Sequence, residues 1–412
     1  MTACRACKSS RMYLFLALGN HPLANGFVTE HALNQPEPRF PLDVHVCLDC
    51  GLIQVADNIP AEFFRQYVYI PSASEVMKEH FAAFADTLAA GPAASHDALV
   101  VDIGCNDGLL LKGLKDQGVR TLGVDPATNI VEMAREKGLD VVNEYFTPAL
   151  ARQIRSEHGP AAVVVTTNTF HHIGDLDTFT EGVTLLLDDD GVFVVEVPYA
   201  LDIVEAGQFD GIYHEHVSQF TMKAFVDLFA RFGMEVLDVQ LLDVHAGSLR
   251  VFAGKATGTG RGPSTTVGEW VDREAQRGLF SAATYDAFRA RVERNRDALL
   301  ELLGSLKRAG ERIVGYGASA RGNTLLNYYG IGPEMLDYIV DRNALKHGLY
   351  TPGMNIPVYG VERLLEDMPP YVLVIAWNFA EEIVRQQAPY AARGGKFLLP
   401  IPEVRVLESA GV

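Results

Sequence analysis

The sequence predicts an α/β protein, and one pattern that occurs twice carries this prediction. In the middle of the chain a β-branched run, residues 99–103, ends in a glycine-bearing turn that leads into a helical stretch, residues 109–115. The same order of strand, glycine turn and helix returns from Arg312 onwards. Strands that alternate with helices form largely parallel sheets, so we expect two such units. Two pairs of cysteines near the start indicate a third, smaller domain.

Composition excludes several classes of partner. The chain of 412 residues carries a formal net charge of -17, which disfavours nucleic acid and anionic membranes because both attract basic surfaces. Apolar runs stay shorter than a membrane span, and residues 12–18 are too short and poorly flanked for a signal peptide. We therefore expect a cytoplasmic protein without nucleic-acid or membrane partners, as a monomer or weak homo-oligomer.

The cysteine pairs have the spacing of zinc knuckles. Cys4 and Cys7 form one C-x-x-C motif, and Cys47 and Cys50 form another. Four thiolates suit a tetrahedral Zn²⁺ site, and a closed four-cysteine shell leaves no position open for chemistry. Disulfides are the weaker interpretation in a reducing compartment, and a redox role is weaker still because no strand precedes Cys4. The fifth cysteine, Cys105, is expected to be only a small residue.

The central glycine turn argues for a nucleotide-like cofactor. Gly104 and Gly108 are spaced G-x-x-x-G, without the third glycine of dinucleotide-binding turns, and Asp125 ends the next strand about 20 positions later. With Asp102 in front, this pattern resembles the motifs of S-adenosylmethionine (SAM) methyltransferases. The alternative is an α/β domain that binds no ligand. We expect SAM above the two glycines, with its ribose on Asp125.

Two further strands should bring polar residues to the same edge of this sheet. The strand over residues 162–166 runs towards Asn168, with His171 and His172 in the loop behind it, and another strand covers 192–198. Ligands of such sheets lie beyond the carboxyl ends of the strands, so Asn168 and His172 should face the cofactor. A helix over residues 75–90 should precede the sheet.

A group of ionisable side chains follows these strands. Tyr213, His214, Glu215 and His216 are consecutive, which suggests acid–base chemistry near the cofactor. A metal site is a weaker interpretation because the two histidines are only two positions apart and the H-E-x-x-H pattern is absent. A polar loop without catalytic function is the remaining alternative.

The C-terminal part has its own glycine turn. A linker over residues 254–263 and a helix over 285–306 precede the pattern Gly315-x-Gly317-x-x-Ala320, and Asp341 ends the next strand. Strands are also expected over 371–376 and 396–399. The turn alone would suggest NAD, but a helix N-terminus flanked by Ser319 and Arg321 could equally take a phosphate of the substrate.

Together these features resemble a known family, the zinc-containing SAM-dependent C-methyltransferases of nucleotide-linked deoxysugars. The motifs that carry the resemblance span nearly the whole chain: the cysteine pairs, Tyr67-Val68-Tyr69 with Ser72, the loop from Asp102 to Gly108, Asn168 with His172, Tyr213-x-Glu215-His216, and Gly315-Tyr316-Gly317-Ala318. The domains would be a zinc-binding domain (1–70), a Rossmann-like SAM methyltransferase domain (71–255) and a Rossmann-like domain (256–412) that helps to bind the nucleotide sugar.

The resemblance also implies an activity and a set of site residues. Similar enzymes methylate C-3 of a dTDP-linked 4-keto-deoxysugar, and some relatives methylate C-5. His216 would be the base, with Tyr67, His172, Tyr213 and Glu215 around the sugar, while His171 and His214 are additional histidines. We expect the cofactor to contact six residues: Asp102, Gly104, Asn106, Gly108, Asp125 and Asn168.

Elementary chemistry agrees with this assignment. Removal of a proton next to a ketone gives an enolate, which is the carbon nucleophile that methylation needs. Histidine titrates near neutral pH and can accept that proton, and Glu215 or a neighbour could fix its tautomer. Two other interpretations stay open: SAM-dependent methylation at oxygen or nitrogen of another small metabolite, and a non-enzymatic zinc-ribbon interaction protein.

Overall fold

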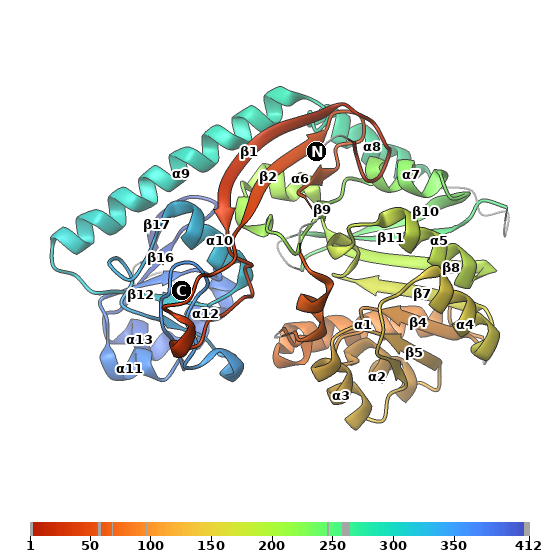
Figure 1. The fold of residues 1–412 in the computed structure, drawn as a ribbon, viewed down its shortest axis with the longest axis horizontal. Helices are drawn as coiled ribbons and strands as arrows, with labels where there is room; N and C mark the ends of the chain where they lie inside the picture. The colour runs from red at the N-terminus through yellow and green to blue at the C-terminus, as the bar shows by residue number, and fades with distance from the viewer. Residues whose placement is uncertain are drawn as a thin grey trace.

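Three β-sheets organise the chain. The computed structural model describes residues 3–56, 59–67, 69–95, 97–244, 247–257 and 264–407. Figure 1 shows two α/β units side by side, with the N-terminal strands β1 and β2 arching above them and the long helix α9 beside these strands. Within the described residues, no helix is both long and apolar enough to cross a membrane.

The N-terminal sheet is antiparallel and has four strands in the order β1-β2-β3-β9. Its strands are β1 (Met12–His21), β2 (Phe40–Cys47), β3 (Ile53–Gln54) and β9 (Ser218–Gln219). The last strand comes from the middle of the chain, where Ser218 pairs with Gln54. The N-terminal sheet is therefore completed by the segment that directly follows His216.

The central sheet has seven strands in the order β10-β11-β8-β7-β4-β5-β6. The strands are β4 (Leu99–Ile103), β5 (Arg120–Val124), β6 (Val141–Val142), β7 (Ala161–Thr167), β8 (Leu187–Pro198), β10 (Met234–Leu242) and β11 (Ser248–Lys255). The pairs from β6 to β8 are parallel, whereas β11 is antiparallel to both of its neighbours. All five residues of β4 are buried, as expected for a parallel strand with helices on both faces.

Among the residues that the structure describes, seven α-helices accompany this sheet, and the first has a clear start signal. They are α1 (Glu75–Ala90), α2 (Leu109–Asp116), α3 (Thr128–Glu136), α4 (Pro148–His158), α5 (Leu176–Leu186), α6 (Ala200–Ala206) and α7 (Met222–Ala230). The Ser74 side chain accepts a hydrogen bond from the Met77 N–H and so caps α1. This cap explains why the predicted bounds of 75–90 match the helix.

The C-terminal sheet has six strands in the order β14-β13-β12-β15-β16-β17. They are β12 (Ile313–Tyr316), β13 (Ile339–Val340), β14 (Val358–Tyr359), β15 (Tyr371–Val374), β16 (Lys396–Leu399) and β17 (Arg405–Leu407). Only the β16–β17 pair is antiparallel among these described strands. The strand order reverses between β12 and β15, as it does between β4 and β7, and such reversals open a crevice for ligands.

The remaining helices join and cover the C-terminal unit. They are α8 (Thr265–Gln276), α9 (Ala282–Arg308), α10 (Ala320–Tyr329), α11 (Arg363–Asp367), α12 (Ala380–Gln386) and α13 (Ala388–Ala392). The predicted linker over 254–263 is wrong at its start, because Gly254 and Lys255 still pair in β11, and residues 258–263 lie outside the described residues. Strand β1 was not predicted from the sequence.

Candidate functional site

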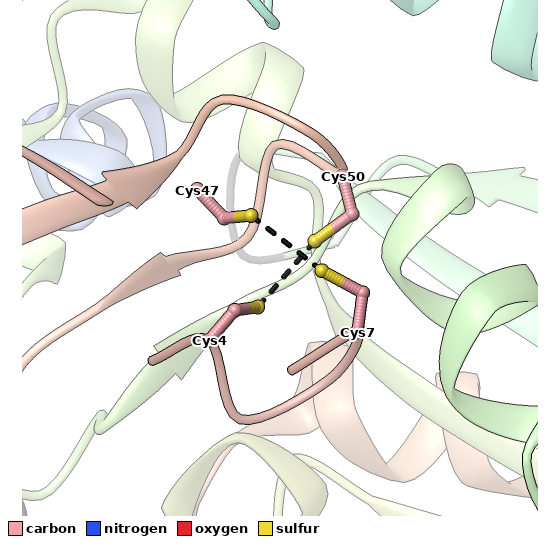
Figure 2. Close-up of side chains that lie close together, drawn as sticks. All are labelled: Cys4, Cys7, Cys47 and Cys50. Carbon is pink, nitrogen blue, oxygen red and sulfur yellow. Dashed lines mark hydrogen bonds between the residues drawn. The ribbon is translucent and has the colours of Figure 1, made fainter. Parts of the chain in front are cut away.

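The four cysteines of the knuckles converge on one point. Cys47 ends β2, and the Sγ atoms are 3.5 Å apart for Cys4 and Cys50 and 3.6 Å apart for Cys7 and Cys47 (Figure 2). All four are free thiols, and at Zn–S bonds of about 2.3 Å a tetrahedral site places its sulfur atoms roughly 3.8 Å apart. The thiols therefore fit one Zn²⁺ ion with four protein ligands, and Cys105 lies elsewhere, in the central glycine turn.

The central glycine turn is shaped by its own backbone and by Asp125. Gly104 and Gly108 have φ angles of 77° and 78°, in the left-handed region where glycine is favoured. The Asp125 carboxylate accepts hydrogen bonds from the Asn106 N–H (2.9 Å) and the Ala127 N–H (2.8 Å). These bonds hold the turn against the end of β5.

A cavity of about 620 Å³ opens beside this turn. Its wall includes Asp102, Gly104, Asn106, Asp125 and Asn168 of the predicted cofactor set. Gly108 is not among the residues that line it, and a Cβ at Gly108 would come within 2.2 Å of Leu139, so this glycine is required by packing.

The side chain of Asp102 indicates which chemical groups a ligand of this cavity should carry. Its Oδ1 is buried and has no hydrogen-bond partner within the described part of the chain. Burial, with the nearby charge of Asp125, raises the pKa of Asp102 to about 8. A ligand that brings N–H donors and positive charge would satisfy this group, and SAM carries both an ammonium and a sulfonium group.

Tyr213 and His216, which also line the cavity, form a hydrogen-bonded pair. The Tyr213 hydroxyl lies 2.6 Å from His216 Nε2, and His216 Nδ1 lies 2.9 Å from the Gly211 carbonyl oxygen. Since a carbonyl only accepts, Nδ1 carries the proton and Nε2 accepts from Tyr213. Burial and the charge of Glu215 raise the pKa of Tyr213 well above its usual value, which keeps the phenol protonated as a donor.

Glu215 is fully buried and is held by the N-terminal part of the chain. Asn25 donates to its carboxylate through Nδ2 (2.6 Å) and through its backbone N–H (3.2 Å), and the Tyr67 hydroxyl lies 3.4 Å from Oε2. Burial raises the pKa of Glu215 to about 7, although the bonds from Asn25 oppose this shift. The Gly211 carbonyl thus accepts the hydrogen bond that fixes the His216 tautomer. The Glu215 oxygens instead accept hydrogen bonds from Asn25 and Tyr67.

Two further histidines pack against His216. The ring centroid of His171 is 4.2 Å from that of His216, and the ring centroid of His172 is 4.9 Å away. Burial lowers the pKa of His172 to about 4, so this imidazole is neutral at neutral pH. His214 instead turns away: its Nε2 donates to the carbonyls of Phe40 (3.1 Å) and Pro41 (3.2 Å).

The C-terminal unit closes the cavity with the start of α10. Arg321 lines the cavity, but its Nε and Nη2 donate to the buried carboxylate of Asp210. The Ser319 hydroxyl accepts from the Gly322 N–H and caps α10. Asp341 accepts from the Ala318 N–H at 2.7 Å, in the same relation that Asp125 has to its own turn.

The structure therefore brings together most of the predicted residues and adds one. Tyr67, His172, Tyr213 and His216 line a single cavity with the central glycine turn. Asn25 also lines it and was missed, because nothing in the turn that contains it marks an asparagine 190 positions before Glu215 as its partner.

Comparison with known proteins gives the class of this site. Three protein-family models match the chain in order: a zinc binding domain over residues 4–64, a methyltransferase domain over 77–239, and a C-methyltransferase C-terminal domain over 243–402. The fold and the site are those of a SAM-dependent methyltransferase with a structural zinc centre.

Similarity to an individual protein shows which kind of methyltransferase this chain is. The chain is 34% identical over 407 residues to C-methyltransferase NovU of Streptomyces niveus, covering 98% of this chain and 97% of that protein. It therefore belongs to the C-methyltransferase family, and a non-enzymatic interaction protein is ruled out.

Two more distant similarities cover only part of the chain. Ubiquinone biosynthesis O-methyltransferase of Bos taurus is 29% identical over 124 residues, covering 27% of this chain and 34% of that protein. Magnesium protoporphyrin IX methyltransferase from Synechocystis, solved with bound SAH, has a TM-score of 0.34 and 14% identity, and covers 44% of this chain and 87% of that one.

Proposed function

We propose that this C-methyltransferase transfers a methyl group to the carbon next to the ketone of a nucleotide-linked 4-keto-deoxysugar. We assign C-3 as the methylated carbon, dTDP as the nucleotide and the cytoplasm as the location. These finer assignments rest on the family resemblance of the sequence motifs. Methylation at C-5, or at oxygen or nitrogen of another small metabolite, is the alternative that the experiment below must exclude.

One observation carries the proposal: an imidazole at the cavity whose Nδ1–H is fixed, so that Nε2 is the nitrogen that can accept a proton. His216 Nδ1–H is fixed on the Gly211 carbonyl, so the lone pair of Nε2 points to Tyr213, which lines the same cavity. Removal of a proton next to a ketone needs such a base with a pKa near the working pH. Methylation of a hydroxyl or an amine depends less on such a base, because the oxygen or nitrogen already carries a lone pair.

The other side chains of this wall have supporting roles in the proposal. The proton passes from the sugar carbon to His216 Nε2, either directly or through the Tyr213 hydroxyl. The neutral His172 ring, which lines the cavity with Tyr213, is the candidate donor for the enolate oxygen, and Tyr67, whose hydroxyl donates to Glu215, lines the same cavity. Glu215 holds Tyr67 in place.

The cofactor-binding wall would hold SAM with the residues of the central turn. When bound, SAM supplies the methyl group that the carbon nucleophile accepts. Asp125 would hold the ribose hydroxyls, and Asp102 would face a positively charged or N–H-bearing part of the cofactor. Asn106 and Asn168 line the same wall. The main contribution of the protein after proton removal is then the alignment of two reactants in one cavity.

Isotope exchange tests the proposal without methyl transfer. Wild-type protein, a dTDP-4-keto-deoxysugar and S-adenosylhomocysteine are incubated in D₂O, and exchange of the proton next to the ketone is followed by NMR. We expect His216→Asn to retain ligand binding but to lose exchange, with methylation falling roughly 10²–10⁴-fold.

Further variants separate the possible proton acceptors. Loss of exchange in Tyr213→Phe as well would show that the hydroxyl relays the proton, whereas exchange that persists there shows direct transfer. Exchange at the wild-type rate in His216→Asn would remove His216 from the role. No exchange in wild type, together with a methylated oxygen or nitrogen in the product, would overturn C-methylation of the sugar.

A further inference from the structure

The N-terminal unit holds the loop that carries His216 at several points. His214 is bound by the carbonyls of Phe40 and Pro41, and Glu215 is bound by Asn25. Directly after His216, the Val217 carbonyl accepts from the Val55 N–H at 3.1 Å. The cysteine-bearing unit thus contacts the loop on both sides of the proposed base.

Arg5 connects the first cysteine pair to this loop. It lies between Cys4 and Cys7, and its guanidinium bridges two carbonyls: Nη1 donates to Val217 (2.6 Å) and Nη2 donates to Val55 (2.5 Å). Its backbone N–H donates to the side chain of Gln54 in β3 at 3.0 Å. Arg5 therefore binds both β3, which follows the second knuckle, and Val217, which follows His216.

A second connection runs through β9. Ser218 and Gln219 pair with β3, and the Thr221 hydroxyl donates to the carbonyl of Cys50 at 2.6 Å. The Gln219 side chain donates to the Gly211 carbonyl, the same oxygen that fixes His216 Nδ1. The position of this carbonyl, and with it the His216 tautomer, depends on the strand that Arg5 and the knuckles hold.

We propose that Arg5 is a positioning residue that couples the four-cysteine zinc centre to the His216 loop. A bound zinc ion would hold the first knuckle, and with it Arg5, in place. The guanidinium of Arg5 then fixes the carbonyls of Val55 and Val217. The planar, fork-shaped guanidinium suits two carbonyls on neighbouring segments, whereas an ammonium group could serve both only imperfectly. The expected effect of Arg5 on catalysis rests on the proposed role of His216. Its expected effect on the order of the loop does not.

The test uses the full-length zinc-loaded protein with Arg5→Ala and Arg5→Lys. Arg11→Ala is the matched control, since Arg11 is a guanidinium of the same unit that pairs with the half-buried Asp49 of the second knuckle and not with Val55 or Val217. Amide hydrogen exchange of the peptide covering residues 211–219, zinc content, SAM affinity, and kcat and KM are measured for each.

We expect Arg5→Ala to retain about one zinc per chain and a SAM Kd within about twofold of wild type. Amide exchange of 211–219 should accelerate at least tenfold, and kcat should fall about tenfold with a smaller change in KM. Arg5→Lys should recover part of both effects, and Arg11→Ala should change neither.

Three outcomes would overturn the inference. They are unchanged amide exchange in Arg5→Ala, loss of zinc together with general unfolding in both Arg5 variants, and an equal effect of Arg11→Ala. If wild type shows no sugar-proton exchange, the proposed function fails, while the amide exchange of 211–219 still decides the role of Arg5.

Discussion

Arg321 holds the buried carboxylate of Asp210 through two hydrogen bonds. Its Nη2 lies 2.9 Å from Oδ1 and its Nε 3.2 Å from Oδ2, and the Trp377 indole N–H donates to Oδ2 at 2.7 Å. Asp210 precedes Gly211, whose carbonyl fixes His216. The C-terminal unit thus reaches the same loop that the N-terminal unit holds from the other side.

We expect Arg321→Ala to act on stability and on the substrate together. Removal of one partner leaves Asp210 charged and buried, which costs about 3–5 kcal/mol in the free energy of unfolding. Because Arg321 also lines the cavity, the substrate KM should rise more than the SAM KM. Denaturant unfolding and steady-state kinetics check both effects.

The control is Arg342→Ala, which breaks the half-exposed pair of Arg342 with Glu382 in the same unit and should cost at most about 1 kcal/mol. Equal destabilisation by the two variants, or a substrate KM that Arg321→Ala leaves unchanged, would contradict the expectation.

Asp125→Ala should weaken SAM binding by roughly 1.5–3 kcal/mol, the usual contribution of hydrogen bonds to a charged group. Isothermal titration calorimetry measures the change. Asp341→Ala is a matched control, since Asp341 holds the equivalent turn of the C-terminal unit and should leave SAM affinity unaltered. A wild-type Kd for Asp125→Ala would argue against its contact with the ribose.

Purified protein should contain about one Zn²⁺ per chain, and Cys47→Ser should lose it. Because metal binding and folding are coupled in such sites, the variant should also expose the β2–β3 region to limited proteolysis. Cys105→Ser is the control: it changes the fifth cysteine and should retain the metal. Elemental analysis showing zinc retained in Cys47→Ser, or a disulfide among the four thiols under reducing conditions, would refute the site.

Glu215 should make the protein less stable as pH rises from about 4.5 to 7. The unfolded carboxyl ionises at about its ordinary pKa of 4.5, whereas the folded one stays protonated up to a pKa of about 7. Over this window the folded state binds the additional proton, so the free energy of unfolding falls with pH, by about 3 kcal/mol at most.

Glu215→Gln should flatten this slope, with urea unfolding measured at pH 5, 6, 7 and 8. Asn25→Ala should extend the slope to higher pH, because the bonds from Asn25 favour the ionised form. Parallel stability curves for wild type and Glu215→Gln would show that the burial of Glu215 does not raise its pKa.

Local signals in the sequence predicted the elements that build the cofactor wall. The β-branched run of β4, the left-handed glycines and the Ser74 cap act within a few residues, so their structural consequences follow from the sequence alone. Family resemblance supplied the roles of Tyr67 and His172, and these assignments remain proposals.

Contacts between distant segments could not be predicted in this way. Arg5 meets Val217 across 212 positions, and Asn25 meets Glu215 across 190, so no spacing rule connects them. Strand β1 was missed because Met12–His21 pairs with β2 through irregular register, with shifts at two places. In the sequence, its apolar residues 12–18 were weighed only as a signal peptide, for which they are too short and poorly flanked.

The pairing of β3 with β9 also sets an order of events during synthesis. Gln54 cannot meet Ser218 until the ribosome has added the intervening strands β4 to β8 of the central sheet, which takes on the order of 10–30 s at 5–20 residues per second. Until then the cysteine knuckles can bind their metal, but β3 presents an open edge. The first segment to leave the ribosome is therefore completed only after about half of the chain has been made, and zinc can bind before the active site closes.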